Sequence, residues 1–362
     1  MPLKNKEVSL LLEKSRLLSQ SSMNDFIRNL SASYEVYAPI KKGKQIVFEK
    51  VENPGEIVWD YETTQISPKK FLHKPFEKLF SFEDGGKIIS ENEEIAEKKQ
   101  ILLGLHPCDV RAVEILDKVF SKRYEDPYYL KRRKNSIIIA LTCNDAHETC
   151  YCTSFSTGPR IDRGYDILIT PLVDNFLVEI GSPRGEEILN QYGEALSTDS
   201  SILMEYHRLK NAKLEVIENK IKNKMNTENL PELLEQNVNH PLWDNLKEEC
   251  LACGSCTIVC PTCYCFTIVD KVDLTLKSGQ RQRVWDSCML LEFAEVALGV
   301  NFRRERAARI KQRIYHKLYS FEHQFYIRGC VGCGRCIRYC IKKIDPREII
   351  AEIRREPIEQ QS

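Results

Sequence analysis

Two runs of cysteines near the C-terminal end of the chain have the spacing of ligands for [4Fe–4S] clusters. The first run comprises Cys250, Cys253, Cys256 and Cys260, and the second comprises Cys330, Cys333, Cys336 and Cys340. In two-cluster ferredoxins the fourth cysteine of each run binds the other cluster. The sequence therefore predicts one cluster on Cys250, Cys253, Cys256 and Cys340, and a second on Cys330, Cys333, Cys336 and Cys260.

Two neighbouring clusters of this kind transfer single electrons, so the pattern indicates electron transfer. Gly254, Gly332 and Gly334 lie inside the two loops, where the backbone must approach sulfur closely. Zinc is an alternative, although zinc motifs usually separate two ligand pairs by a long gap. Disulfides are not expected, because the charged N-terminal segment has no apolar core typical of a signal peptide. Fifteen cysteines then indicate metal binding in a reducing cytoplasm.

Four more cysteines lie in the N-terminal part of the chain: Cys108, Cys143, Cys150 and Cys152. Two of them follow predicted buried strands, at the sheet edge where ligands usually bind in α/β folds. We expect these four thiols to hold a third [4Fe–4S] cluster, with Asp109 and His147 as possible substitute ligands. The alternative is that some of these cysteines are simply buried apolar residues.

Three cysteines fall outside these sets. Cys263 and Cys265 follow the first run in the string CPTCYCF, and packing beside a cluster is the simplest interpretation of both. Cys288 in WDSCM has no assigned role. A cationic stretch from Arg303 to Lys317 has helical spacing, and we interpret it mainly as a solvent-exposed helix with Glu305 as a partner. Its alternative role is a docking face for a partner, or a positive field near anionic clusters that raises their potential.

Buried strands must position the N-terminal cysteines. Apolar runs predict strands at Gln100–Leu105 and Ser136–Thr142, with a helix between them that ends near Phe120. Further expected elements are a helix over Glu7–Leu18, strands at Glu35–Tyr37, Gln45–Val51, Asp166–Thr170 and Phe176–Ile180, and a helix at Gly185–Tyr192. Residues 53–98 resist assignment, and 285–320 is predicted as long helices.

The expected fold is an α/β or α+β N-terminal domain followed by a mostly helical ferredoxin-type domain with two [4Fe–4S] clusters. The predicted boundaries are 1–195 for the N-terminal domain, 196–242 for a polar helical bridge, and 243–362 for the dicluster domain. The 362 residues carry 53 Lys plus Arg and 52 Asp plus Glu. This balance gives no reason to expect nucleic-acid binding, and no apolar stretch is long enough to predict a membrane span.

Several longer strings resemble one protein family. They are LGLHPCDVRAV, CGSCTIVCPTCYCF, RVWDSCM, NFRRERAARIKQRIYHK and GCVGCGRCIRYC, in this order. The chain resembles the iron–sulfur subunits that include the beta subunit of soluble sulfhydrogenases and the A subunit of anaerobic sulfite reductase. One departure is Ile341 after Cys340, where the family pattern usually has proline.

The resemblance implies a cytoplasmic electron-transfer subunit with no independent active site. Its expected partners are an FAD- and NAD(P)-binding flavoprotein subunit and the catalytic subunit of a [NiFe] hydrogenase. The chain has no dinucleotide-binding motif of its own. Alternative parent complexes are anaerobic sulfite reductase and enzymes of the heterodisulfide reductase type. In a third alternative, of a different class, the N-terminal cysteines form a substrate-reducing site.

Overall fold

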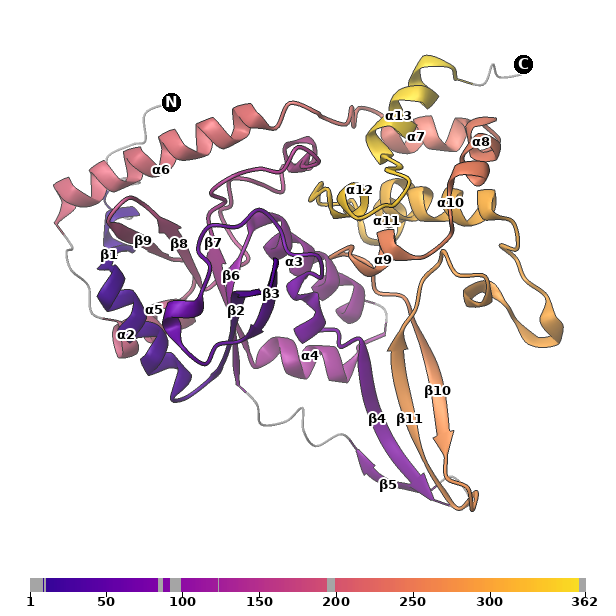
Figure 1. Ribbon diagram of the computed structural model, residues 1–362, viewed down its shortest axis with the longest axis horizontal. Helices are drawn as coiled ribbons and strands as arrows, with labels where there is room; N and C mark the ends of the chain where they lie inside the picture. The colour runs from indigo at the N-terminus through magenta and orange to yellow at the C-terminus, as the bar shows by residue number, and fades with distance from the viewer. Residues whose placement is uncertain are drawn as a thin grey trace.

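Figure 1 shows the computed structural model of the chain, which describes residues 9, 11–83, 87–91, 99–122, 124–193 and 199–357. The described residues form a seven-stranded sheet, a separate four-stranded sheet and a group of helices that surrounds the two cysteine runs. The expected mixed α/β class is therefore confirmed.

The seven-stranded sheet forms the core of the N-terminal part. Its strands, in order across the sheet, are β1 (Ser15–Ser19), β9 (Asn175–Ile180), β8 (Ile167–Pro171), β7 (Ser136–Leu141), β6 (Gln100–Leu105), β2 (Glu35–Lys42) and β3 (Gln45–Lys50). The central strands β2, β6, β7 and β8 run parallel. Every residue of β6 and β7 is buried, as expected for parallel strands covered on both faces.

Helices cover this sheet and connect its strands. They are α2 (Gln20–Ser31), α3 (Pro107–Ser121), α4 (Pro127–Lys134), α5 (Pro183–Tyr192) and α6 (Ser200–Lys220). The chain passes from β6 into α3 through His106. Pro107 lies in the first turn of the helix, where an N–H has no partner within the helix, so the missing N–H of proline costs no hydrogen bond. The strand and helix predictions from residue 100 to 192 are confirmed to within a few residues.

The predicted helix over Glu7–Leu18 is wrong for its second half, and part of that segment lies outside the described residues. Ser15–Ser19 is instead the edge strand β1, which pairs antiparallel with β9. Leu17 and Leu18 are both buried there. Partner hydrogen bonds and burial against the sheet outweigh the helical spacing of the leucines.

The four-stranded sheet joins two hairpins that are far apart in the sequence. Its order is β10 (Phe266–Val272), β11 (Ser278–Trp285), β4 (Phe76–Glu83) and β5 (Lys87–Glu91), and all neighbours are antiparallel. Figure 1 shows these strands extending together away from the rest of the molecule. The segment 53–98, which resisted assignment, supplies β4 and β5 to this sheet, and the dicluster region supplies β10 and β11. The description of the dicluster region as mostly helical is therefore incomplete.

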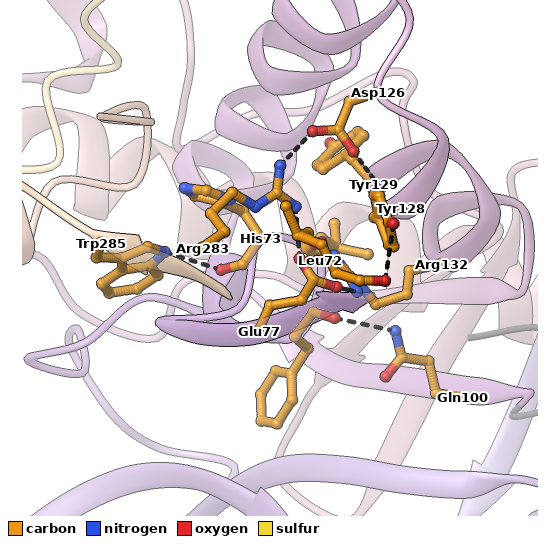
Figure 2. Close-up of polar contacts among 12 residues, drawn as sticks. Leu72, His73, Glu77, Gln100, Asp126, Tyr128, Tyr129, Arg132, Arg283 and Trp285 are labelled. Atoms are coloured by element: carbon orange, nitrogen blue, oxygen red, sulfur yellow. Dashed lines mark hydrogen bonds and ion pairs between the residues drawn. The ribbon is translucent and has the colours of Figure 1, made fainter. Parts of the chain in front are cut away.

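A buried ionic cluster fixes this sheet to α4 (Figure 2). Glu77 of β4 is paired with Arg132 of α4, which donates through Nη2 at 3.2 Å, and with Arg283 of β11, which donates at 2.5 Å. Arg283 also pairs with Asp126, the residue that caps α4. Nearby, the indole of Trp285 donates to the His73 carbonyl at 3.2 Å. The strand that ends at Trp285 is therefore anchored to the N-terminal part of the chain.

The remaining helices surround the cysteine runs. They are α7 (Leu230–Gln236), α8 (Leu242–Glu249), α9 (Ser255–Ile258), α10 (Arg306–Tyr315), a π-helical turn (His316–Ser320), α11 (Phe321–Phe325), α12 (Arg335–Arg338) and α13 (Pro346–Arg355). The prediction of long helices across 285–320 is wrong before Arg306, where the regular helical structure consists of two short 3₁₀ turns. The predicted domain boundaries stay predictions, and the four-stranded sheet draws strands from both sides of them.

Candidate iron–sulfur sites

The first cavity gathers five thiols from both cysteine runs, one of which, Cys336, also lines the second cavity. The lining of the first cavity includes Cys250, Cys253, Cys256 and Cys340. Cys250 ends α8, and Gly254 takes a φ of 75° as α9 begins. This left-handed conformation turns the backbone around the cavity without a Cβ penalty. Cys340, from the second run, follows α12.

The second cavity has the reciprocal set. Its lining includes Cys330, Cys333, Cys336 and Cys260. Two groups contact the thiol of Cys330: the Gly332 N–H donates to it at 3.4 Å, and the Tyr151 hydroxyl lies 3.4 Å from it. Hydrogen bonds to sulfur of this kind tune a bound cluster.

The two cavities adjoin each other. Cys336 and Arg313 line both of them. The short helices α9 and α12 are in contact, and the Ser255 hydroxyl donates to the Tyr339 carbonyl at 3.1 Å. Cys340 therefore lines the cavity of the first run and Cys260 the cavity of the second run. The exchanged assignment of ligands stays a prediction.

The thiols fit an iron–sulfur cube by chemistry as well as by position. Burial raises the pKa of Cys256 and of Cys330 to about 11 each. Metal binding must therefore remove these protons, because the thiolate is the ligand. Within the described part of the chain, no three His, Cys, Asp or Glu side chains converge closely enough to hold one metal ion. In an iron–sulfur cube each thiolate binds a different iron, whereas in a zinc site all four ligands bind one ion. Four thiols spread around a cavity fit the cube better.

The N-terminal cysteines come together beside the second cavity. Cys143, Cys150 and Cys152 pack in one group, and Cys108 packs against Cys333. The pKa of Cys108 is raised by burial and further by the negative charges of its neighbours, Cys143 among them. The fold thus gathers Cys143, Cys150 and Cys152 in one cluster and places Cys108 in a neighbouring cluster with Cys333.

Hydrogen bonds to main-chain carbonyls connect the segment around this group to the second cysteine loop. The Tyr151 N–H donates to the Gly332 carbonyl at 2.8 Å, and the Thr157 hydroxyl donates to the Val331 carbonyl at 2.7 Å. A Cβ on Gly334 would lie 2.3 Å from the Thr149 carbonyl oxygen. Only glycine fits at this contact, because backbone cannot yield as a flexible side chain can.

Asp109 is less suited to be a substitute ligand than the sequence indicates. It forms a fully buried, two-pronged ion pair with Arg335, with both N–O distances at 2.8 Å. Arg335 also donates through Nε to the Thr64 carbonyl at 2.7 Å. The pair joins the residue after Cys108 to a residue between Cys333 and Cys336. Its one signal in the sequence is a charged residue inside a cysteine run.

The cationic stretch 303–317 is not a solvent-exposed helix face throughout, so that interpretation is wrong for its buried members. Arg309 is 6% exposed and donates to the Arg303 carbonyl at 3.1 Å. Lys317 is 7% exposed and lines the second cavity. Burial alone lowers the pKa of Lys317, and the negative charges of nearby thiolates raise it by more than burial lowers it.

Lys69 is a residue that the sequence analysis missed. It is 4% exposed, and its ammonium donates to the carbonyls of Cys260 and Cys263 at 2.8 Å each. Burial lowers its pKa to about 8, so the amine is mostly protonated at neutral pH. No pattern around Lys69 marks it, because its partners lie far along the chain.

The last three cysteines lie beside the two cavities and line neither of them. Cys263 is next to Cys260, whose thiol pKa is lowered chiefly by a hydrogen bond from Cys263. A hydrogen bond from Cys288 similarly lowers the pKa of Cys265 to about 7. These contacts agree with the interpretation that Cys263 and Cys265 pack near the predicted ligands, and they place Cys288, which had no assigned role, beside Cys265.

Comparison with known proteins identifies the family. The profile of the 4Fe-4S dicluster domain matches residues 249–344, which contain both cysteine runs. Sulfhydrogenase 2 subunit beta of Pyrococcus furiosus is 34% identical over 334 residues, which cover 91% of this chain and 95% of that protein. The chain belongs to the sulfhydrogenase beta-subunit family. The resemblance noted from the sequence is thereby confirmed. No solved structure matches the chain significantly.

Membership of the sulfhydrogenase beta-subunit family accounts for the iron–sulfur character of the C-terminal cysteine runs, and the dicluster match supports iron–sulfur clusters there. It leaves the third cluster a prediction. Among the helices that the structure describes, none is both long and apolar enough to cross a membrane.

Proposed function

We propose that this chain is an iron–sulfur electron-transfer subunit of a hydrogenase-type complex. One observation carries the proposal: two adjoining cavities, one lined by five cysteines and the other by four, share Cys336 and Arg313. Groups that exchange single electrons must lie close together, and a common wall provides that proximity. The family of the chain supplies the hydrogenase context, since its relative is a sulfhydrogenase subunit.

The proposed ligands follow the cavity linings. Cys250, Cys253, Cys256 and Cys340 hold one [4Fe–4S] cluster, and Cys330, Cys333, Cys336 and Cys260 hold the second. When bound, the clusters supply one-electron redox chemistry. The protein orients the thiolates through α9 and α12, donates hydrogen bonds to sulfur, and keeps water from the second site.

We also propose a third [4Fe–4S] cluster on Cys108, Cys143, Cys150 and Cys152. The support is the shared packing of Cys143, Cys150 and Cys152, together with the burial of Cys108 in one cluster with Cys333. The Cys150 thiol also lies 4.0 Å from the Cys333 carbonyl. Such a site extends the electron path from the dicluster region into the N-terminal part. The exposed thiol of Cys253 marks the opposite end of that path.

The proposed partners are an FAD- and NAD(P)-binding flavoprotein subunit and a [NiFe] catalytic subunit, assembled with this chain in the cytoplasm. The support for them is the family relationship together with the absence of a dinucleotide-binding motif from the sequence. Coexpression tests this part directly. We expect this chain to copurify with a hydrogenase catalytic subunit encoded beside its gene, and a siroheme protein in that place would favour sulfite reductase instead.

A second candidate function, reduction of a substrate at the N-terminal cysteines, has one observation in its favour. An open cleft of about 1630 Å³ lies at the carboxyl edge of the parallel strands, next to Cys143. Lys213 and Arg338 contribute positive charges to its lining, and Asp60 and Asp145 contribute negative ones. If all four N-terminal cysteines bind iron, no coordination position is open for a substrate, and this candidate fails.

Metal analysis tests the cluster count. We expect about twelve iron atoms and as many acid-labile sulfides in each chain purified without oxygen, which corresponds to three cubes. The Cys150→Ser variant is expected to retain about eight. About eight in both proteins would remove the third cluster from the proposal and leave the two others. Zinc without iron would overturn the proposed function.

A further inference from the structure

Two buried ammonium groups hold the turn that carries Cys260. Lys69 donates to the carbonyls of Cys260 and Cys263, and Lys317 donates to the carbonyl and the hydroxyl of Thr262, all at 2.8 Å. The two lysines come from opposite ends of the sequence, and together they occupy acceptors on three residues of one short segment. Their charges are therefore fixed beside a wall of the second cavity.

Neither lysine has a carboxylate to balance its charge. Over the ranges that the structure describes, no ion pair joins Lys69 or Lys317 to an acidic side chain. A buried charge without an opposite charge is strongly unfavourable. The neighbours of Lys317 that carry negative charge when ionised include Cys260 and Cys330, which are proposed ligands, together with Cys263 and Tyr264. The charges that balance these lysines therefore belong to the thiolate site itself.

The fold holds Lys69 in place from the side of the four-stranded sheet. Its ammonium lies 4.2 Å from the centre of the Trp285 ring, a favourable cation–π contact. Trp285 ends β11 and is anchored to the His73 carbonyl, next to the ionic cluster of Glu77 and Arg283 (Figure 2). The hairpin inserted between the cysteine runs therefore positions a charge at the second cavity.

Lys317 is held by the π-helical turn His316–Ser320. Such turns are rare and occur frequently at functional sites. The Lys317 carbonyl accepts a hydrogen bond from the Gly329 N–H at 2.9 Å, which ties the turn to the start of the second cysteine run. Its ammonium also lies 5.1 Å from the centre of the Phe321 ring.

We propose that Lys69 and Lys317 raise the reduction potential of the cluster held by Cys260, Cys330, Cys333 and Cys336. This inference rests on the proposed function. Reduction adds one electron and thus one negative charge to the site, and a fixed positive charge nearby stabilises the reduced form more than the oxidised form. Buried charges act strongly because little solvent screens them. The proposed step is the transfer of one electron to the cluster, and it moves no proton.

Among the described residues, the first cavity has no pair of buried lysines. Its lining includes Lys342, which is exposed, and Arg313, which it shares with the second cavity. Arg306 donates to the Cys250 carbonyl at 3.0 Å but is exposed. Exposed charges are weakened by solvent and salt. The two lysines should therefore act selectively on the second cluster.

The experiment is a potentiometric titration of the full chain, followed by electron paramagnetic resonance under anaerobic conditions. Lys69→Gln and Lys317→Gln remove the charge and keep a hydrogen-bond donor. Lys70→Gln and Lys311→Gln are matched controls, because both lysines are more exposed, Lys70 pairs with Glu49, and Lys311 donates to the Val238 carbonyl.

Each test variant is expected to lower the reduced-to-oxidised ratio of the second cluster at least tenfold at a fixed potential, which is 59 mV for one electron. The first cluster and both controls should not shift. Lys69→Arg and Lys317→Arg should keep the potential of the second cluster close to its wild-type value, because arginine keeps the positive charge. Equal shifts of both clusters, or no shift in a variant with its full iron content, would overturn the inference.

Iron content separates this inference from the proposed function. A wild-type chain that binds no cubes would refute the function, whereas full cubes without a potential shift refute only the role of the lysines. If a Gln variant loses its second cube, the salt dependence of the two reduction potentials in the wild-type chain tests the role of the lysines instead. Added salt should then move the potential of the exposed first cluster and leave that of the second nearly unchanged. A second cluster as salt-sensitive as the first would contradict the role of buried charges.

Discussion

The two cysteine cavities have the same ligand spacing and very different surroundings. In the first run Cys253 is exposed, and its neighbour Leu251 is 52% exposed. In the second run Cys333 is buried, and Val331, the residue that corresponds to Leu251, is 2% exposed. The N-terminal cysteine group covers the second loop, and solvent reaches the first. A binding motif thus selects the metal group, and the packing around it decides the environment in which that group works.

This comparison suggests a division of labour. The first site, at the surface, suits exchange of electrons with a partner. The second site is enclosed by Tyr151, Lys69 and Lys317. It suits electron transfer at a fixed potential between the first site and the proposed N-terminal site. The predictions below test whether the ligands are exchanged between the runs and whether the second loop depends on its covering as the structure indicates.

The largest expected effect comes from the exchanged cysteines. Cys340→Ala should abolish the first cluster although Cys340 belongs to the second run, and Cys260→Ala should abolish the second cluster. Each variant should lose about four iron atoms per chain. Metal analysis together with electron paramagnetic resonance checks this prediction, and Cys288→Ala, which removes a thiol that lines neither cavity, is the control. Loss of the same cluster in both variants would contradict the exchange.

The next effect concerns the buried Arg335–Asp109 pair. Arg335→Met should lower the free energy of unfolding by about 3–5 kcal/mol, because it leaves the Asp109 carboxylate buried without a partner. Arg338→Met removes a partly exposed pair with Glu62 and should change it by at most about 1 kcal/mol. Anaerobic urea denaturation followed by circular dichroism measures both. Equal losses would mean that Arg335 is no more important than a surface arginine.

The glycines of the two loops should differ as their surroundings do. Gly254 and Gly334 have φ values of 75° and 72°, so alanine is strained at both. A Cβ at 334 would meet the backbone of Thr149, whereas one at 254 would meet the side chain of Ser287 at 3.1 Å. Gly334→Ala should cost roughly 2–4 kcal/mol of unfolding free energy, and Gly254→Ala less.

Gly299→Ala provides the control for backbone strain alone. Gly299 has a φ of 73°, and the nearest atom to an added Cβ lies 4.0 Å away. Its cost should be about 1 kcal/mol, measured by the same denaturation. If Gly334→Ala costs no more than this variant, the second loop does not pack tightly against Thr149.

The smallest expected effect is at the matched positions 251 and 331. Val331→Ala should cost roughly 1.5 kcal/mol of unfolding free energy, because two buried carbons are removed. Leu251→Ala removes more atoms but should change it by no more than about 0.5 kcal/mol, because the side chain is exposed. Thermal unfolding of the anaerobic proteins compares them. A larger loss for Leu251 would indicate that the first loop is covered in solution.

The sequence alone determined the elements whose signals are local. Fixed spacing identifies both cysteine runs, because three ligands of one cube must lie within seven residues. Continuous apolar runs identify β6 and β7, because parallel strands are buried on both faces. The family strings identify the sulfhydrogenase beta-subunit relationship.

Only the tertiary structure decided the rest, because those features depend on contacts between distant parts of the chain. The strand β1 forms where β9 offers hydrogen bonds, and β10 and β11 form a sheet with β4 and β5, almost two hundred residues earlier. Lys69 has no local pattern that marks it, and it reaches Cys260 only because Trp285 and the ionic cluster around Glu77 hold the hairpin beside it. Charge and burial at the second cavity are properties of that assembly, since they arise from residues that the chain brings together only when it folds.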